Sequence, residues 1–335
     1  MSGQFSSLSS TGGPRIPRWT LGGHALPWLL AIGFYFVGGG YLSLGTNTLI
    51  MVLFALSLDL VLGFAGIVTL GQAAFYGFGA YAAGIFAIRV VPDPLAGLAV
   101  ATVAAGLLGL LTGMLILHTR GVTLMMLTLA IAALLAQFAN QARGLTGGDD
   151  GLSNINVAPV LGLFPFDLWG RTAYLYALAV LFLWFVVTWR VMRSPFGRSL
   201  DGIRQNDRRM RAIGTPVWRR LVAVYGLGAA MAGSAGALTA QTTALVGLNS
   251  LSLLASGTVL VVIILGGTRR LYGAFAGAVV YVVAQDLTAE VDPFRWMFVI
   301  GAMLMAAVLF LENGLAGAVD RGVALMAPLW RGRRR

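Results

Sequence analysis

The chain has 335 residues, of which 58% are hydrophobic and only 10% are charged, and its mean hydropathy is +0.83. These values lie far outside the range of soluble domains and predict an integral membrane protein with many apolar helices. All 23 basic residues are arginine, and the absence of lysine and cysteine excludes a P-loop nucleotide site, disulfide bonds, thiol nucleophiles and thiolate metal sites in this chain.

The predicted elements begin after a polar tail. Residues 1–25 are rich in glycine and serine and contain no apolar core before a small-residue cleavage site, which predicts a cytoplasmic tail that is not a cleaved signal peptide. Residues 26–314 then form the transmembrane domain, and 315–335 form a basic cytoplasmic tail. We predict an all-α polytopic membrane protein of about ten transmembrane helices, near residues 26–44, 47–64, 67–88, 95–117, 121–141, 172–189, 219–242, 252–267, 271–288 and 296–313. The glycine-rich stretch 63–79 is predicted either as a clean helix or as a broken or re-entrant segment.

The distribution of arginine predicts the orientation of these spans. With a cytoplasmic N-terminus, most arginines fall in the inner segments, which are 1–25, about 65, 118–120, 190–218, 268–270 and the C-terminal tail. The outer segments hold few arginines and most of the acids, namely Arg89, Arg143, Arg171, Arg295, Asp93, Asp149, Asp150, Asp167, Glu290 and Asp292. This bias predicts that both termini are cytoplasmic and that the number of spans is even. Because the arginines occur in short groups between apolar spans, the basic composition does not indicate nucleic-acid binding.

The longest inner segment, residues 190–218, is the most basic part of the chain. Residues 193–220, which overlap this segment, read RSPFGRSLDGIRQNDRRMRAIGTPVWRR, and apolar residues recur there every three to seven positions at Phe196, Leu200, Ile203, Met210 and Ile213. This spacing is typical of one or two short amphipathic helices lying beneath the membrane. From the spacing alone, an ordinary solvated positive-inside loop remains an equal alternative.

This segment resembles the cytoplasmic coupling loop of ATP-binding-cassette (ABC) importer permeases, in the version found in branched-chain amino-acid permeases of the Liv type. Three other stretches are similar to the same family in the same order: LSLDLVLGFAGIVTLGQAAFYGFGAYAAG at 56–84, MMLTLA with LTGGDDGL at 125–130 and 145–152, and VVIILGGTRRLYGAFAGAVV at 261–280. The LTGGDDGL stretch favours the M-type subunit over the shorter H-type partner. The chain departs from the family pattern at Asp59, where asparagine is usual, at Gln72, where histidine is frequent, and at Asp207 with its neighbouring arginines.

The resemblance implies a transport subunit with no catalytic residue, metal or cofactor of its own. It implies a second homologous or identical permease subunit, two cytoplasmic ATPase subunits that bind ATP and Mg²⁺, and an extracytoplasmic solute-binding protein, assembled in a bacterial cytoplasmic membrane. The residues expected at the ATPase contact are Gly197, Arg198, Leu200, Ile203, Arg204 and Gly214. Arg208, Arg209 and Arg211 are expected to contact either this partner or anionic lipid headgroups.

Asp59 is the clearest acidic residue within a predicted span. Because a carboxylate inside a bilayer costs at least about 2.5–3.5 kcal/mol, we expect it to face the protein interior or water, or to be protonated. It is predicted either to line the solute path, pairing with an ammonium or amide group, or to be a structural pin to Thr69 or Gln72; a position near the inner mouth is also compatible with the sequence. Thr69, Gln72 and Asn140 complete the predicted path residues.

The outer loop predicted from Thr146, Gly147, Gly148 and Asp149 is expected to close over the channel mouth or to contact the binding protein. His24 and His118 are the only histidines, so the sequence predicts neither a metal cluster nor a Ser-His triad.

Three classes of function are compatible with the composition. The first is the importer permease, for branched-chain amino acids or, alternatively, for urea, short amides or aromatic acids. A proton-coupled secondary carrier would need several intramembrane acids, and an intramembrane enzyme would need a polar cluster at one depth. Because the chain shows one clear intramembrane acid, Asp59, the sequence favours the importer permease.

Overall fold

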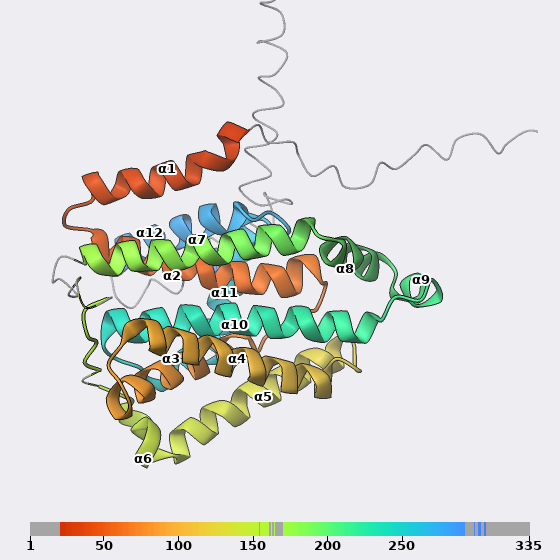
Figure 1. Ribbon diagram of the computed structural model, residues 1–335, viewed down its shortest axis with the longest axis horizontal. Coiled ribbons are helices and arrows are strands. Elements are labelled where there is room, and N and C mark those ends of the chain that lie inside the picture. Colours follow the sequence, from red (N-terminus) through yellow and green to blue (C-terminus); the bar gives the residue numbers. More distant parts are fainter. Residues whose placement is uncertain are drawn as a thin grey trace, which may run out of the picture.

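The regular structure of the protein is helical. The computed structural model describes residues 21–153, 155–160, 162, 164 and 170–291, with the single positions 298, 301, 302 and 305. Within this part of the chain, β-pairing is limited to two isolated bridges. The elements (Figure 1) are α1 Leu21–Val37, α2 Leu42–Leu58 with its π-helical continuation η1 Asp59–Phe64, α3 Gln72–Arg89, α4 Pro94–Ile116, α5 Val122–Gln141, α6 Arg143–Thr146, η2 Gly148–Asp150, α7 Arg171–Arg193, α8 Pro195–Gln205, α9 Asp207–Ala212, α10 Val217–Thr243, η3 Leu248–Leu251, α11 Leu253–Gly266 and α12 Gly273–Val291.

These helices confirm an all-α polytopic membrane protein. The first nine predicted spans coincide in order with α1 to α5, α7 and α10 to α12. Among the described residues, five helices are long and apolar enough to cross a membrane, namely α2 with η1, α4, α5, α7 and α10, and α1, α11 and α12 are apolar but shorter. The predicted tenth span, 296–313, lies mostly outside the described residues, so the count of ten stays a prediction. The predicted tails 1–25 and 315–335 also lie outside them, except that α1 already begins at Leu21.

Helix α10 occupies the centre of the bundle and α5 its periphery (Figure 1). Of the most apolar window of each helix, 78% is buried in α10 and 22% in α5. Small residues let α10 approach its neighbours closely: the backbones of Gly233 and Gly79 lie against each other, and Gly236 lies against the carbonyl of Tyr76. This is the packing expected between membrane helices, whose association depends on close contact because lipid provides no hydrophobic driving force.

The glycine-rich stretch 63–79 is broken, but over a shorter length than predicted. The polypeptide leaves helical geometry at residues 65–71 and α3 begins at Gln72, five residues later than the predicted span. Side chains of other helices satisfy the freed amide groups, since Leu70 N donates to Thr128 Oγ1 at 3.3 Å and Ala73 N donates to Ser256 Oγ at 3.0 Å. Such replacement bonds allow a non-helical segment to exist within a bundle of membrane helices.

The bundle has two distinct ends. At the coupling-loop end, residues 63–66, 117–121, 194–214 and 267–270 come together. At the outer-loop end, residues 89–94, 142–160 and 243–252 come together, through bonds such as Ala158 N to Pro92 O at 2.7 Å. Figure 1 shows α8 and α9 at one end of the bundle and α6 at the other. The segments that the arginine bias assigned to a common side of the membrane therefore share an end of the fold.

Candidate functional site

The segment predicted as the coupling loop folds into two short helices, which is one of the alternatives that its apolar spacing left open. Ser194 caps α8 by accepting a hydrogen bond from Phe196 N at 3.2 Å, and Pro195 occupies the first turn. Asn206 ends α8 and caps α9, because its Oδ1 accepts from Arg209 N at 3.0 Å. Serine and asparagine at these positions supply acceptors for amide groups that have no partner within the helix.

Helix α8 packs tightly on the end of α7. A Cβ atom added to Gly197 would lie 2.3 Å from the carbonyl oxygen of Met192 and 2.5 Å from its Cα, so only glycine permits this approach. Leu200 and Ile203, on the same side of α8, are 0% and 5% exposed. The inner face of the amphipathic helix is therefore covered by the protein's own spans.

Arg204 connects α8 to the end of α2. Its Nη1 donates to the carbonyl oxygen of Gly63 at 2.6 Å, and its aliphatic stem lies against Gly66. Burial lowers the pKa of Arg204, and the nearby charge of Arg269 lowers it further. The bond joins the coupling loop to the point where α2 gives way to the non-helical segment 65–71.

A second link runs through Arg269, in the turn between α11 and α12. Its Nη2 lies 2.6 Å from Asp201 Oδ1, and its backbone amide donates to Asp59 Oδ1 at 2.8 Å. Asp59 is 2% exposed, and its carboxylate lies directly over Gly63. Asp59 is thus pinned, but to Arg269 of the α11–α12 turn, and not to Thr69 or Gln72 as the structural alternative predicted.

A third link joins α9 to the turn between α4 and α5. Arg120 forms an ion pair with Asp207, and Arg211 Nε lies 3.6 Å from the same carboxylate oxygen. The hydrogen bond from Arg120 holds the pKa of Asp207 below its usual range, and the same bond raises the pKa of Arg120. Asp207, which the sequence comparison treated as a departure, is therefore a bonding partner within this chain.

The six residues predicted at the ATPase contact do not share one surface. Gly197, Leu200 and Ile203 are buried against the chain itself, and Arg204 reaches inward to Gly63. Arg198 and Gly214 are exposed, and so is part of Arg204 despite its bond to Gly63. The sequence missed the partners Arg120, Asp201, Gly63 and Arg269, although the arginine bias had placed their segments on one side of the membrane.

The predicted path residues are spread along the bundle. Asp59 lies at the coupling-loop end, whereas Thr69 and Gln72 flank the start of α3. Gln72 is buried and its Nε2 donates to Ser57 Oγ at 3.1 Å and to Gly228 O at 3.2 Å. Asn140 lies near the opposite end, where its carbonyl oxygen is next to Gly148. The structure therefore does not gather these four side chains into one solute site.

The predicted outer loop is an ordered turn. Thr146 is buried, and its Oγ1 donates to Ala142 O at 2.9 Å. Gly147 has a φ of 76°, a conformation that favours glycine, and a Cβ there would meet the Gly151 carbonyl. Asp149 is exposed next to this turn. Beyond it, Leu152 and Val246 exchange backbone hydrogen bonds of 2.8 and 2.9 Å, which tie the loop to the segment after α10.

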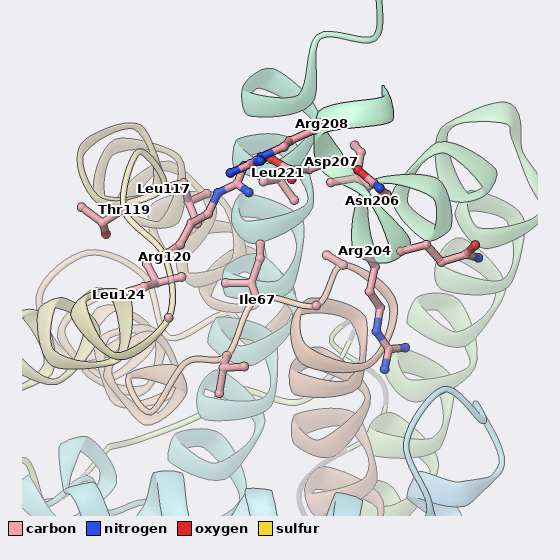
Figure 2. A pocket seen from close by; sticks show the side chains of 16 residues that line it. Ile67, Leu117, Thr119, Arg120, Leu124, Arg204, Asn206, Asp207, Arg208 and Leu221 are labelled. Atoms are coloured by element: carbon pink, nitrogen blue, oxygen red, sulfur yellow. The ribbon is translucent and has the colours of Figure 1, made fainter. Parts of the chain in front are cut away.

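A pocket of about 510 Å³ lies at the coupling-loop end. Its walls come from residues 65–68 of the non-helical segment, residues 117–124 around the α4–α5 turn, residues 203–208 of the coupling loop, and Leu221 of α10. In Figure 2 Arg120, Asp207 and Arg208 gather at one edge, whereas the guanidinium group of Arg204 points away from them. Among the described residues, no group of three or more His, Cys, Asp or Glu side chains could hold a metal ion.

Comparison with known proteins places this geometry in context. Residues 40–308 match the family described as the permease component of branched-chain amino acid transport systems. The chain is 26% identical over 310 residues to the high-affinity branched-chain amino acid transport system permease protein LivM of Escherichia coli strain K12, an alignment that covers 86% of this chain and 72% of that protein. It is 27% identical over 308 residues to the LivM protein of Salmonella typhimurium strain LT2, covering 84% and 71%. No solved structure matches the chain.

Proposed function

The chain belongs to the family of branched-chain amino acid transport permeases, and on this premise we propose that it is the M-type membrane subunit of an ABC importer. In this proposal it pairs with a second homologous permease subunit, binds two cytoplasmic ATPase subunits that supply ATP and Mg²⁺, and receives solute from an extracytoplasmic binding protein. The coupling-loop end and both termini face the cytoplasm of a bacterium. The solute is a branched-chain amino acid, the class named for both LivM relatives.

The observation that carries this proposal is the set of three links from α8 and α9 to separate parts of the bundle. Arg204 reaches the end of α2, Asp201 reaches the α11–α12 turn, and Asp207 reaches the α4–α5 turn. A chain without a nucleotide-binding lysine needs its motor in another subunit. A displacement of α8 and α9 by that motor would be passed directly to three of the segments that join the spans.

The burial pattern divides the coupling loop into two faces with different roles. The inner face, with Leu200 and Ile203, holds the loop to the spans. The outer face presents Arg198, Arg209, Gly214 and the 70% exposed side chain of Ile213. An exposed isoleucine surrounded by arginines has the character of an apolar anchor with a charged rim. We assign the ATPase contact to this outer face.

ATP-driven uptake of radiolabelled leucine into proteoliposomes, by the chain reconstituted with its permease, ATPase and binding-protein partners, tests the proposal. Arg204→Gln should lose most of the uptake while ATP hydrolysis continues, because the link to Gly63 is removed and the outer face is intact. Arg219→Gln changes an exposed arginine at the start of α10, outside both faces of the coupling loop, and is the matched control that should keep uptake near the native level. Leucine uptake that needs no ATP, or full uptake by Arg204→Gln, would contradict this function.

A further inference from the structure

The pocket at the coupling-loop end has two chemically different walls. One wall is aliphatic and comes from four separate segments, with the side chains of Ile67, Leu117, Leu124, Ile203 and Leu221. The other wall carries Arg120, Asp207 and Arg208, which lie together in Figure 2. The volume of about 510 Å³ lies within the range of about 300–1,000 Å³ that small-molecule sites occupy. An apolar wall combined with a few convergent polar and charged groups is a usual feature of such a site.

The charged wall contains both signs. A guanidinium group binds a carboxylate through two parallel hydrogen bonds, and a carboxylate binds an ammonium group. The neighbouring Arg120 and Asp207 therefore complement the two charges of a zwitterion, with Arg208 as a further donor at the same edge. A purely anionic group, such as a lipid phosphate, would find the two arginines but would also face the Asp207 carboxylate, which repels it.

The aliphatic wall provides the surface that would contact the side chain of a ligand. Leu117, Leu124 and Ile203 are each less than 10% exposed, so they form a firm surface at the base of the cavity. Burying a leucine- or isoleucine-sized side chain against such a surface favours binding. An unbranched polar zwitterion such as glycine would gain nothing from this wall.

From these two walls we propose that the pocket binds a free aliphatic amino acid in its zwitterionic form. Its carboxylate pairs with Arg120 and Arg208, its ammonium group with Asp207, and its side chain lies on the aliphatic wall. The choice of a branched-chain ligand rests on the proposed function. Because the bound molecule touches the coupling loop, the α4–α5 turn and segment 65–71 at once, it holds these three parts in one arrangement. Solute that accumulates on the coupling-loop side of the membrane therefore slows the transport cycle.

Direct binding of radiolabelled leucine to the assembled permease–ATPase complex in nanodiscs, without the binding protein, tests the site. Saturable binding is expected for the native complex, and Arg208→Gln should weaken it about tenfold, because one charge-assisted contact is lost. Arg219→Gln changes an exposed arginine at the start of α10 that does not line the pocket, and this variant should bind leucine like the native complex. Leu124→Trp fills the aliphatic wall and should abolish binding, whereas Leu111→Trp, at an exposed position of α4, should not.

Two leucine analogues, each lacking one charged group of the amino acid, test the two charged contacts separately in the same assay. Leucinamide has no carboxylate and 4-methylpentanoate has no ammonium group, so each should compete at least tenfold more weakly than leucine. Competition by 4-methylpentanoate as strong as by leucine would show a general anion site and would overturn the proposal. No saturable leucine binding, or binding that is equal in native, Arg208→Gln and Leu124→Trp complexes, would also overturn it.

The regulatory consequence has its own readout in the same nanodiscs. Leucine added to the native complex should lower ATP hydrolysis, and it should lower it less in Arg208→Gln. These measurements do not depend on uptake, so their failure leaves the importer function standing. Conversely, if leucine is not taken up into proteoliposomes but binds the pocket as described, the proposal that leucine is the transported solute is wrong, whereas the proposed binding site is supported.

Discussion

The two ends of the bundle are held together by different kinds of bond. At the outer-loop end, backbone pairs such as Leu152–Val246 and Ala158–Pro92 join the segments, beside side-chain bonds from Arg89 to Gly144 O and from Gln241 to Pro94 O. At the coupling-loop end a charged side chain takes part in each of the three links, through Arg204, Arg269 and Arg120. Backbone pairing fixes two segments at one separation, whereas a long side chain can release its partner and bind again with little change of the main chain. This difference indicates that the coupling-loop end is the more adjustable of the two.

A disulfide crosslink placed at each end should give the largest difference in uptake between the two ends. The chain has no native cysteine, so two introduced cysteines can form an intramolecular disulfide only with each other. A Cβ on Gly66 would lie 3.5 Å from Arg204 Cβ, within the separation of about 3.5–4.5 Å that a disulfide needs. We expect oxidation of Gly66→Cys/Arg204→Cys to abolish the uptake that remains in its reduced form, and a reductant to restore it.

The matched outer pair is Leu152→Cys/Val246→Cys, because hydrogen-bonded partners in a bridge have Cα atoms about 5.5 Å apart, also suitable for a disulfide. Oxidation of this pair should leave leucine uptake nearly unchanged. Each single-cysteine variant controls for the substitution, which matters at Gly66 because its φ is 73°. Equal inhibition by both crosslinks would mean that the outer-loop end rearranges as much as the coupling-loop end.

Gly197→Ala should have the next largest effect. The new Cβ overlaps the backbone of Met192, so α8 must move away from α7. Overpacking of this kind costs about 1–3 kcal/mol, and we expect uptake to fall about tenfold while ATP hydrolysis continues. The same change at Gly257 of α11, where nothing lies within 4 Å of the added Cβ, should have little effect. Similar uptake by the two variants would show that the fit of α8 on α7 does not matter for coupling.

A smaller effect is expected from the Asp201–Arg269 link. Both side chains are 33% exposed, and ion pairs of this kind contribute about 0.2–1 kcal/mol. Asp201→Asn and Arg269→Gln should each lower uptake by about twofold to fivefold, because the Arg269 backbone still holds Asp59. The double variant should be no worse than the more impaired single variant, since both changes remove one interaction. Losses that multiply in the double variant would place the two side chains in separate roles.

Much of the fold follows from the sequence because apolar segments of span length have few alternative structures in a bilayer. Nine of the predicted spans coincide with described helices, and the two coupling-loop helices and the interruption at residues 65–71 were each among the alternatives that the sequence left open. The interruption is shorter than predicted because Thr128 and Ser256, on distant helices, satisfy the amides at the start of α3. No local pattern around residues 65–71 identifies those partners.

The site was less predictable than the fold. The sequence identified the coupling loop, but its amphipathic pattern does not say whether the apolar face of α8 meets a partner or the chain's own spans. Leu200 and Ile203 were assigned to the partner, and the structure buries them internally. Asp59 was expected to face the interior or water, or to be protonated; the structure buries it, and its bond to Arg269 spans 210 positions of sequence. Links between distant loops depend on how the helices pack, which the spacing of residues along one segment does not determine.

The smallest expected effect is that of pH on the stabilisation provided by the Arg120–Asp207 pair. Arg120 holds the pKa of Asp207 below its usual range, so the stabilisation from this pair is complete above the ordinary aspartate pKa of about 3.9 and is lost only as pH falls through the lower folded value. Asp207 therefore stays charged between pH 5 and 8. Over that window we expect the native chain and Asp207→Asn to differ by a constant amount in their thermal unfolding midpoints.

Differential scanning fluorimetry of the purified assembly at several pH values measures this difference. His118 lies two residues before Arg120 and packs against Trp218, with ring centroids 5.1 Å apart, so His118→Gln is measured beside both chains as the control for the histidine of the same turn. A difference between the native chain and Asp207→Asn that shrinks from pH 8 to pH 5, and still does so in the His118→Gln background, would mean that Asp207 takes up a proton in this range. In that case Arg120 would not hold the third link closed, and the coupling-loop end would have only two charged attachments at neutral pH.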